Sequence, residues 1–395
     1  MKELNNIIAC GENSKVEFKA VSVSPKVLAE EIVAFLNVRG GIIYIGVEDD
    51  GTISGIDINR KASLEETIVN VCRNNILPPI IPDIEIVKCG DKWIAKLIIA
   101  EGLSKPYQTI GGNLFIRAGS SKRVSSREEL LRLFQNSLVI HIDNHPVPGT
   151  SLNNLVLDRL KQFFESVYEL DLSVMDEKEQ INLFINASIL TPVDNKINST
   201  LAGLLFFAQS DPTFPVMEKF LPQAGIQFVS YDSEDMTHIL DRYTCYEASP
   251  QAIDSVIHKI RLNWKTPSTI KGLLRIERSF PMKIFRELIV NAIVHRDYSI
   301  QSLIFIRMYP HKVEIQSPGN LVNTVTIEKM KAGISVPRNP LIIKFMQNFR
   351  YADQLGRGIP MILKTLENFP DLNLILQASD DYFICVLEIQ TSIDF

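Results

Sequence analysis

The sequence has few cysteines and no pattern that would join them. Its five cysteines, Cys10, Cys72, Cys89, Cys245 and Cys385, are far apart and form no Cys-x-x-Cys pair. This spacing argues against a zinc ribbon and a disulfide framework, so we expect free thiols in a reducing compartment. The start of the chain lacks a secretory leader, and no apolar run reaches the roughly 18 to 20 residues that cross a bilayer. We therefore predict a cytoplasmic protein without a membrane span.

An excess of basic residues is also missing. The chain holds 41 Lys and Arg against 46 Asp and Glu, for a formal net charge of −5. A protein that binds duplex nucleic acid by charge alone is usually basic. Any nucleic-acid site must therefore be a local patch, or a site assisted by metal or shape. The sequence also lacks a Walker A motif, so we do not expect a P-loop nucleotide site.

The length of 395 residues predicts two or three domains. A segment rich in Pro, Asn, Gly and Ser at 141–154 has the composition of a linker. We expect an α+β protein with a mixed front domain over 1–140, a middle α/β region over 151–275, and a C-terminal two-layer α/β sandwich over 276–395.

The front region alternates helical and extended patterns. Apolar residues at helical spacing predict helices, and β-branched runs between turn signals predict strands. The predicted helices are 26–38, 63–76 and 125–137, and the predicted strands lie within 84–90, 92–100 and 113–119. Residues 40–57 predict a strand, an acidic turn and a second strand, with Asp50-Gly51 as the hairpin signal. In the middle region, 199–209 and 224–232 predict strands.

Acidic residues of the front region fall at two places that a fold could bring together. Glu12 and Glu17 lie in one short segment with Lys19, and Asp49 follows a predicted strand. Carboxylates that share a cleft can hold Mg²⁺ or Mn²⁺, which activate water and neutralise charge in phosphodiester cleavage. Lys19 could position the scissile phosphate. Alternatively, Asp49 and Asp50 are ordinary turn residues and Glu12 is a surface charge.

Basic residues of the same region are candidates for contact with nucleic-acid phosphates. They are Lys19, Arg39, Lys105, Arg117, Lys122 and Arg123. The sequence Ser-Ser-Lys-Arg places two of these cations beside hydroxyls that also donate to phosphate oxygens. A solvated turn is an equal alternative for Lys122 and Arg123.

Residues 10–135 resemble the Schlafen/AlbA-type domain. The resemblance rests on the segments EFK, AFLNVRGGIIYIGVEDDGTISGI, KPY and LFIRAGSSKRVSSREEL. It implies a nucleic-acid-handling domain. In the Schlafen nucleases two Glu and one Asp form the active site, and by motif these fall on Glu12, Glu17 and Asp49. Many bacterial proteins with this domain are instead described as DNA-binding transcriptional regulators, and pairing of such domains implies a homodimer.

A stripe of polar side chains marks a strongly helical segment near the C-terminus. Glu287, Asn291 and His295 recur every fourth residue, which puts them on one helical face. The opposite face carries Phe285, Ile289 and Ile293. Burying the polar stripe without partners would be costly, and a bound Mg²⁺-nucleotide would supply partners.

This stretch resembles the N-box of GHKL ATPases, and more closely the C-terminal domain of RecG-like proteins, which residues 276–392 fit throughout. The resemblance implies ATP with Mg²⁺ as cofactors, Glu287 as general base and Asn291 as Mg²⁺ ligand. It implies two glycine segments, VEIQSPGNL and GRGI, and two further marks, HRDY and the Arg-Asn-Pro at 338–340. The implied nucleotide contacts are Asn291, His295, Asp297, Ser317, Gly319, Gly356 and Gly358.

One position departs from the family pattern. Typical GHKL ATPases carry an Asp before the first glycine segment, where it accepts from the adenine amino group. Here Ser317 stands nearby in Ser-Pro-Gly, where the RecG-like branch usually has Asn-Pro-Gly. Nucleotide binding, hydrolysis, and a degenerate fold without either therefore stay open as alternatives.

The combination of the two modules predicts a nucleotide-responsive nucleic-acid-binding protein, in the first place a DNA-binding transcriptional regulator. The alternative is a metal-dependent nuclease that acts on RNA, tRNA or single-stranded DNA in stress or phage defence. A third reading is a scaffold in which both sites are relics.

Overall fold

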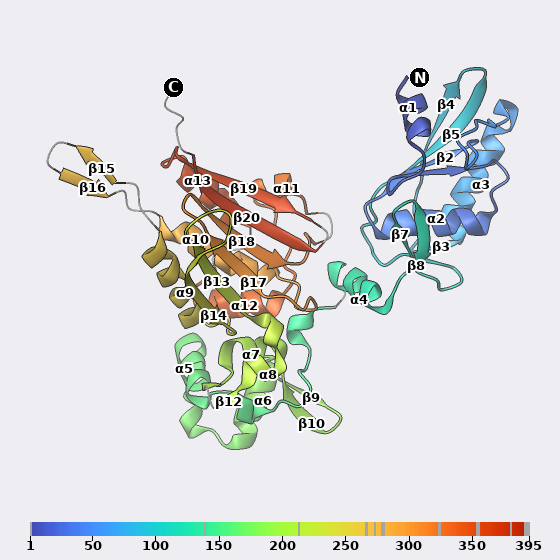
Figure 1. Cartoon of the computed structure of the whole chain (residues 1–395). Coiled ribbons are helices and arrows are strands. Elements are labelled where there is room, and N and C mark those ends of the chain that lie inside the picture. The colour runs from blue at the N-terminus through green and yellow to red at the C-terminus, as the bar shows by residue number, and fades with distance from the viewer. Residues whose placement is uncertain are drawn as a thin grey trace. The chain divides into compact units, whose positions relative to one another are not determined.

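The structure is a computed structural model that describes residues 2–137, 140–211, 214–264, 268–271, 274–277, 281–322, 325–352, 356–379 and 381–390. The chain divides into two compact units, which we call the front unit, Met1–Ile140, and the back unit, His141–Phe395 (Figure 1). Both units combine helices with mixed sheets, which confirms the α+β class. None of the described helices is long and apolar enough to pass through a membrane.

The front unit is built on a four-stranded sheet in the order β1-β2-β5-β4. Strands β1 and β2 are parallel, and the other neighbours are antiparallel. The strands of this sheet are β1 (Val16–Lys19), β2 (Gly41–Ile45), β4 (Asp83–Cys89) and β5 (Lys92–Ile99). Short pairs add β3 (Ile76–Leu77), β6 (Gln108–Thr109), β7 (Phe115–Ala118) and β8 (Ser121–Val124). The helices are α1 (Lys2–Cys10), α2 (Pro25–Asn37), α3 (Lys61–Asn74) and α4 (Arg127–Asn136).

Alternation along the strands gives this sheet two apolar faces. Ile43 and Ile45 face a core shared with α2 and α3, whereas Tyr44 faces the second core, against which Ile7 and Ile8 of α1 pack. Helix α2 begins at Ser24, whose side chain accepts from the Val27 N–H, and Pro25 stands in its first turn. Figure 1 shows α1 and α2 on opposite sides of the strands.

Asn37, at the last turn of α2, fastens this helix to two later segments. Its amide donates to the Tyr107 carbonyl at 2.8 Å and to the Phe115 carbonyl at 2.9 Å, and its oxygen accepts from the Tyr107 N–H at 2.7 Å. The residue is buried. One side chain therefore satisfies three backbone groups, two of them on the buried Tyr107.

The predicted hairpin at 40–57 is only half formed. Its first strand is β2, but the return segment bridges back only between Val47 and Ile53, and Ile56 bridges to Trp93 of β5 instead. The backbone turns at Gly46 and Gly55, both at positive φ, and the Gly55 N–H donates to the Gly46 carbonyl at 2.9 Å. These two glycines close a loop where the pattern predicted a strand.

The back unit contains a six-stranded sheet in the order β14-β13-β17-β18-β20-β19. Its strands are β13 (Ile226–Tyr231), β14 (Ile239–Cys245), β17 (Ile304–Met308), β18 (Lys312–Pro318), β19 (Leu372–Ala378) and β20 (Tyr382–Ile389). Strands β13 and β17 are parallel, and all other neighbours are antiparallel. Short pairs are β9 (Leu190–Val193) with β10 (Lys196–Ser199), β11 (Ser210–Asp211) with β12 (Phe214–Pro215), and β15 (Ser268–Lys271) with β16 (Leu274–Glu277).

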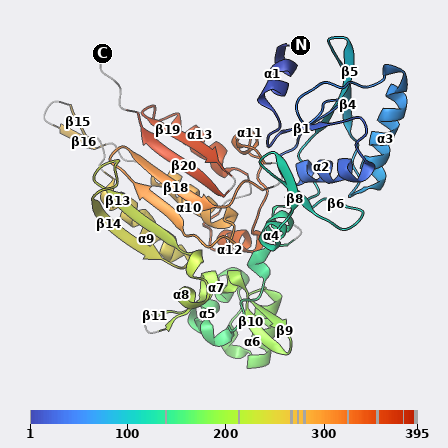
Figure 2. The same cartoon turned by 45° about the vertical axis from the view of Figure 1, so that its right-hand side comes forward.

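Helices cover one face of this sheet. They are α9 (Pro250–Asn263), α10 (Met282–His295) and α13 (Gly358–Leu366), with α11 (Ile327–Lys331) and α12 (Pro340–Asn348) nearby. Figure 2 shows the strands side by side with α9 and α10 behind them. Along β18, Val313, Ile315 and Ser317 are buried while Glu314 and Gln316 are not, so the sheet has one apolar and one polar face.

A small helical layer lies at one end of the sheet (Figures 1 and 2). Its helices are α5 (Leu157–Tyr168), α6 (Glu177–Asn186), α7 (Leu201–Phe207) and α8 (Val216–Phe220). Buried rings from α5, α7 and α12 pack edge to face: Phe163, Phe206, Phe207 and Phe345. The core is continuous from these helices to the sheet.

Two predictions for the middle region are wrong. The boundary predicted between residues 275 and 276 does not separate two units, because β13 of the middle region pairs in parallel with β17. Residues 199–209 form helix α7 rather than a strand. Every residue of α7 is buried, so no polar face marks its period, and Thr200 starts it by accepting from the Gly203 N–H at 2.9 Å.

Replacing Asn37 by Ala should destabilise the front unit by about 3 kcal/mol, because two buried backbone groups and one part-buried group lose their partners. Native-state hydrogen exchange of the α2 amides measures this loss. Asn70→Ala, on the exposed side of α3, is the matched control and should change the result by less than about 0.5 kcal/mol. Equal effects of both substitutions would contradict the role given to Asn37.

Candidate functional site

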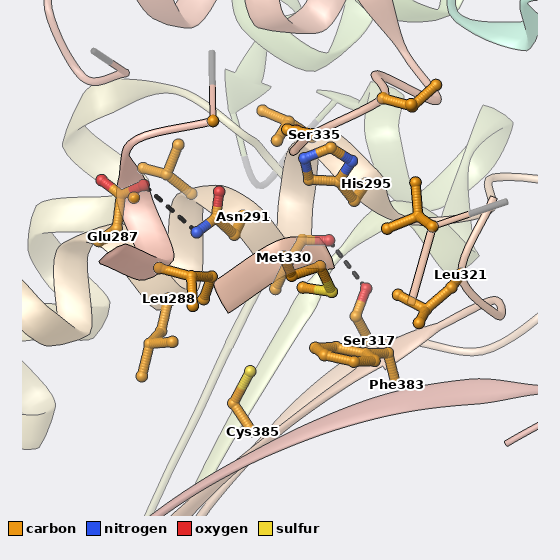
Figure 3. Close-up of a pocket in the computed structure, with 18 of the residues that line it drawn as sticks. Glu287, Leu288, Asn291, His295, Ser317, Leu321, Met330, Ser335, Phe383 and Cys385 are labelled. Carbon is orange, nitrogen blue, oxygen red and sulfur yellow. Dashed lines mark hydrogen bonds between the residues drawn. The ribbon is translucent and has the colours of Figure 1, made fainter. Parts of the chain in front are cut away.

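The back unit contains a cavity between α10 and the glycine-rich turns. It holds about 1280 Å³ of space outside protein atoms, open solvent included. Figure 3 shows Glu287, Asn291 and His295 of α10 along it, as their spacing predicted, while Phe285 and Ile289 are buried on the other side of the helix. The lining also includes Ser317, Gly319, Gly356 and Gly358. Six of the seven predicted nucleotide contacts therefore border one hollow, together with Glu287.

One end of the cavity is polar. The Asn291 amide donates to Glu287 Oε1 at 3.3 Å, within one turn of α10 (Figure 3). Gly358, the first residue of α13, packs against both side chains, because an added Cβ would lie 1.9 Å from Glu287 Oε1 and 3.2 Å from Asn291 Nδ2. A larger residue at 358 would require the Glu287 carboxylate, the end of a flexible side chain, to move away. The N-terminus of α13, with its outward N–H groups, thus borders the same end.

The other end is mainly apolar. Leu321, Met330, Phe383 and Cys385 line it, and Ser317 lies across from Phe383 on the neighbouring strand. The Ser317 hydroxyl donates to the Ala292 carbonyl of α10 at 2.8 Å (Figure 3). Because this bond uses its one proton, the Ser317 oxygen can only accept from a group in the cavity.

His295 lies between the two ends. Burial lowers the pKa of its imidazole to about 4, and the positive charge of Arg338 acts in the same direction. The ring is therefore neutral at physiological pH, with one nitrogen donating and the other accepting. A neutral ring beside the cavity can contact a ligand without adding charge.

Asp297 is the one predicted nucleotide contact that does not line the cavity. Its carboxylate is buried, accepts from the Ser299 N–H at 2.9 Å and pairs with Arg338 at 3.0 Å. Its Cα and Cβ pack against Gly319, which has a φ of +105° and leaves no room for a side chain. Arg296 is fully buried and donates to the Ser302 carbonyl at 2.5 Å. Arg296 and Asp297 therefore do not line the cavity but pack behind the residues that do.

The cavity is apolar at one end and polar at the other, as a purine nucleotide is. The apolar end can enclose a base, and the polar end offers backbone N–H groups at a helix N-terminus to phosphates. Asn291 and Glu287 supply hard oxygen atoms at this end, as Mg²⁺ requires when phosphates complete its shell. Arg357, exposed in the second glycine turn, adds a cation at the rim.

The predicted acidic trio of the front unit is not assembled as a metal site. Among the described residues, no group of three or more His, Cys, Asp or Glu side chains is placed to hold a metal. Burial raises the pKa of Glu12, and the carboxylates of Glu17 and Asp49 raise it further, so the three are within electrostatic reach. However, Glu17 is held by Arg117 and Lys19, and Asp49 is exposed.

Arg117 is not a phosphate contact, and this prediction is wrong. Its side chain is 1% exposed and pairs with Glu17 at 2.5 Å and Glu31 at 3.2 Å. It also donates to the Asn13 carbonyl at 2.8 Å and the Ser120 carbonyl at 3.0 Å. The pattern FIRAGSS placed Arg117 on a strand but could not show that its side chain points into the unit.

The other predicted cations differ in their exposure and in the ion pairs and hydrogen bonds that they make within the protein. Lys19 is half-buried at Glu17, and Lys122 pairs with Glu30 and Glu31 at 3.1 and 3.0 Å. The sequence signal missed Glu31, on which these charges converge. Lys105 donates to the Val38 carbonyl at 2.7 Å and to Glu101 at 2.5 Å, Arg123 is exposed in a pair with Glu129, and Arg39 is exposed.

Several cavity residues were missed by the sequence analysis. Phe383 and Cys385 lie two apart on β20, and strand alternation after the final Asp-Asp could have placed both on the sheet's inner face. Arg357 stands inside the predicted glycine turn and could have been found there. No local signal pointed to Asn320 or Met330, because they reach the cavity through loop and short-helix geometry.

Comparison with known protein families assigns both units to a class. Residues 12–126 match the family model "Schlafen, AlbA_2", and residues 301–387 match the model "Putative ATP-dependent DNA helicase recG C-terminal". Part of the front unit thus matches the Schlafen AlbA_2 model and part of the back unit matches the RecG C-terminal model, which confirms both resemblances. Together the two domains suggest nucleic-acid binding combined with ATP binding. The second match begins after α10.

Two solved structures are similar to the chain at a low level. A protein of Corynebacterium diphtheriae is 18% identical with a TM-score of 0.47, covering 98% of this chain and 80% of that one. The N-terminal domain of an ATP-dependent DNA helicase RecG-related protein from Nitrosomonas europaea is 21% identical with a TM-score of 0.26, covering 32% of this chain and 88% of that one. No curated protein matches the chain.

The low pKa of His295 predicts a loss of stability in acid. The unfolded chain takes up this proton near pH 6.5, but the folded chain does so only near a pKa of about 4, so stability present above 6.5 is lost as pH falls towards 4. His295→Gln should remove up to about 3 kcal/mol of this acid-dependent loss. Urea unfolding of both proteins at several pH values measures it. Parallel pH profiles for the two proteins would show that the ring is not kept neutral.

Proposed function

We propose that this protein is a nucleotide-responsive DNA-binding protein, in which the back unit binds ATP and the front unit binds DNA. The observation that carries the proposal is the division of the cavity. Glu287, Asn291 and Gly358 form a polar end, and Phe383 and Leu321 lie in the apolar part that the base would enter. This order matches the chemistry of a nucleoside triphosphate along its length.

Ser317 supports adenine as the base. Its oxygen accepts but does not donate within the cavity, since its proton is bonded to Ala292. The amino group of adenine is a donor at the position where guanine carries an acceptor oxygen. A single buried acceptor therefore favours adenine, although a neutral hydroxyl binds an amino group more weakly than the carboxylate of typical relatives.

Magnesium would be held by Asn291, with Glu287 beside it. When bound, the ion neutralises phosphate charge and lets the anionic nucleotide lie near the Glu287 carboxylate. Glu287 can also accept a proton from a water molecule directed at the terminal phosphate. ATP binding requires the whole lining of the cavity, whereas ATP hydrolysis also depends on how the Glu287 carboxylate is oriented.

The front unit is proposed to bind DNA without cleaving it. Support comes from the exposed cations Arg39 and Arg123, and from the occupation of Glu17 by Arg117, which competes with a metal for the same carboxylate. The proposed role of this binding is regulation of transcription. ATP bound in the back unit would change the affinity of the front unit for DNA.

ATP binding should depend on the Asn291 side chain. Equilibrium dialysis with labelled ATP and Mg²⁺ is expected to show binding by the wild-type chain and a loss of about tenfold or more for Asn291→Ala, because the proposed ion loses a ligand. Ser317→Ala should reduce the preference for ATP over GTP. Glu287→Gln should keep binding and abolish any slow hydrolysis.

Asn182→Ala, at the surface of α6 and remote from the cavity, is the control and should leave ATP affinity unchanged. Absence of ATP binding by the wild-type chain at millimolar concentration would remove the nucleotide part of the proposal.

DNA binding should depend on exposed cations of the front unit. The double variant Arg39→Ala/Arg123→Ala should bind a DNA duplex about tenfold more weakly, and the slope of log affinity against log salt should fall by about 1 to 2. Arg60→Ala is the matched control, since its side chain is 85% exposed in the same unit. Fluorescence anisotropy with DNA, and with RNA as competitor, provides the measurement.

The same samples, incubated with tRNA or single-stranded DNA and Mn²⁺, should remain intact. Cleavage that disappears in Glu17→Ala would contradict binding without chemistry and would establish the nuclease alternative.

A further inference from the structure

Two sequence marks of the back unit consist mainly of residues that do not line the cavity, His295 excepted. They are the His-Arg-Asp-Tyr segment at the end of α10 and the Arg-Asn-Pro segment at 338–340. They are about forty residues apart in the sequence, but the structure joins them through buried side chains. This junction lies directly behind the wall of the cavity.

Arg338 connects two parts of the wall. Its Nη1 pairs with Asp297 Oδ2 at 3.0 Å, and its Nη2 donates to the Asn320 carbonyl at 2.6 Å. Asn320 lines the cavity, and Asp297 follows α10. Both partners of the ion pair are at most 5% exposed. Because the guanidinium is planar and rigid, it sets the distance between the α10 end and the glycine turn after β18.

Asn339 adds a second attachment to α10. Its amide donates to the Val294 carbonyl at 2.9 Å and to the Arg296 carbonyl at 2.8 Å. These groups belong to the C-terminal end of a helix, where carbonyls lack helical partners. The turn that carries Glu287 and Asn291 is thus continuous, through one helix, with the Arg-Asn-Pro segment.

Leu341 and Ile342, which follow Asn339 and Pro340, are hydrogen-bonded to the start of the back unit. The buried Asp143 carboxylate accepts from the Leu341 N–H at 2.7 Å and the Ile342 N–H at 3.1 Å, at the first turn of α12. His141 Nδ1 lies 3.5 Å from the Arg338 carbonyl. Residues 141–144 follow the front unit directly in the chain.

We propose that Arg338 is a positioning residue that couples nucleotide occupancy of the cavity to the segment 141–144, through which the front unit is attached. The coupling rests on the proposed ATP site. A nucleotide between α10 and the glycine turn would contact Asn320 and the helix that leads into Asp297, so it would stabilise the junction in one arrangement. The ordered junction in turn holds α12 and its bonds to Asp143.

Hydrogen exchange of the Leu341 and Ile342 amides reports on this coupling, because Asp143 accepts from both. Addition of ATP and Mg²⁺ to the wild-type full chain is expected to slow their exchange by about fivefold. In the double variant Arg338→Met/Asp297→Asn, nucleotide should bind more weakly, and at saturation the slowing should be absent.

The double variant separates positioning from mere stability. Removing both charges avoids a buried unpaired carboxylate, and Met keeps the length of the Arg stem, so the fold is retained. If the double variant keeps the full slowing, Arg338 is only structural and the proposal is overturned. Arg338→Lys keeps the charge beside Asp297 but lacks the rigid fork, and should show reduced slowing. Arg261→Met, on the exposed side of α9, should behave as wild type.

The two proposals fail in different ways. Wild-type chain that binds ATP in dialysis but shows no slowing at Leu341 and Ile342 overturns the coupling and leaves the ATP site standing. Wild-type chain that binds no ATP overturns both.

Discussion

The position of the Glu287 and Asn291 side chains against Gly358 is the contact on which the cavity depends. These two members of the polar stripe of α10 face the start of α13, and the missing Cβ at 358 lets that helix approach them. A carboxylate, an amide and a helix N-terminus are thereby brought to one place. The rest of the cavity follows from it: α10 lies on the sheet, so its next turns face Ser317 and Phe383, and the polar end continues into an apolar one.

The front unit uses charge differently. A buried network around Glu31 and Arg117 pairs several of its acidic and basic side chains and joins β1, α2 and the β7-β8 hairpin. Such a network costs desolvation and holds only when complete. Side chains engaged in this way define the fold, so contact with nucleic acid is left to exposed cations, in agreement with the modest net charge.

Sequence patterns predicted the elements that have a clear period. Helix α10 and the glycine segment before α13 were both predicted, because polar stripes and glycines are local signals. Two of the errors concern burial. Helix α7 is apolar on every side and shows no period, and Arg117 was assigned to the surface although Glu17 and Glu31 surround it. A further boundary was predicted between residues 275 and 276 because the pairing of β13 with β17 is non-local and leaves no local signal.

A crystal structure of the full chain with a non-hydrolysable ATP analogue and Mg²⁺ tests the central claim most directly. The account predicts phosphates at Glu287, Asn291 and Gly358, and the adenine between Ser317 and the apolar end of the cavity. A cavity filled by protein side chains, or an analogue bound elsewhere, would contradict it.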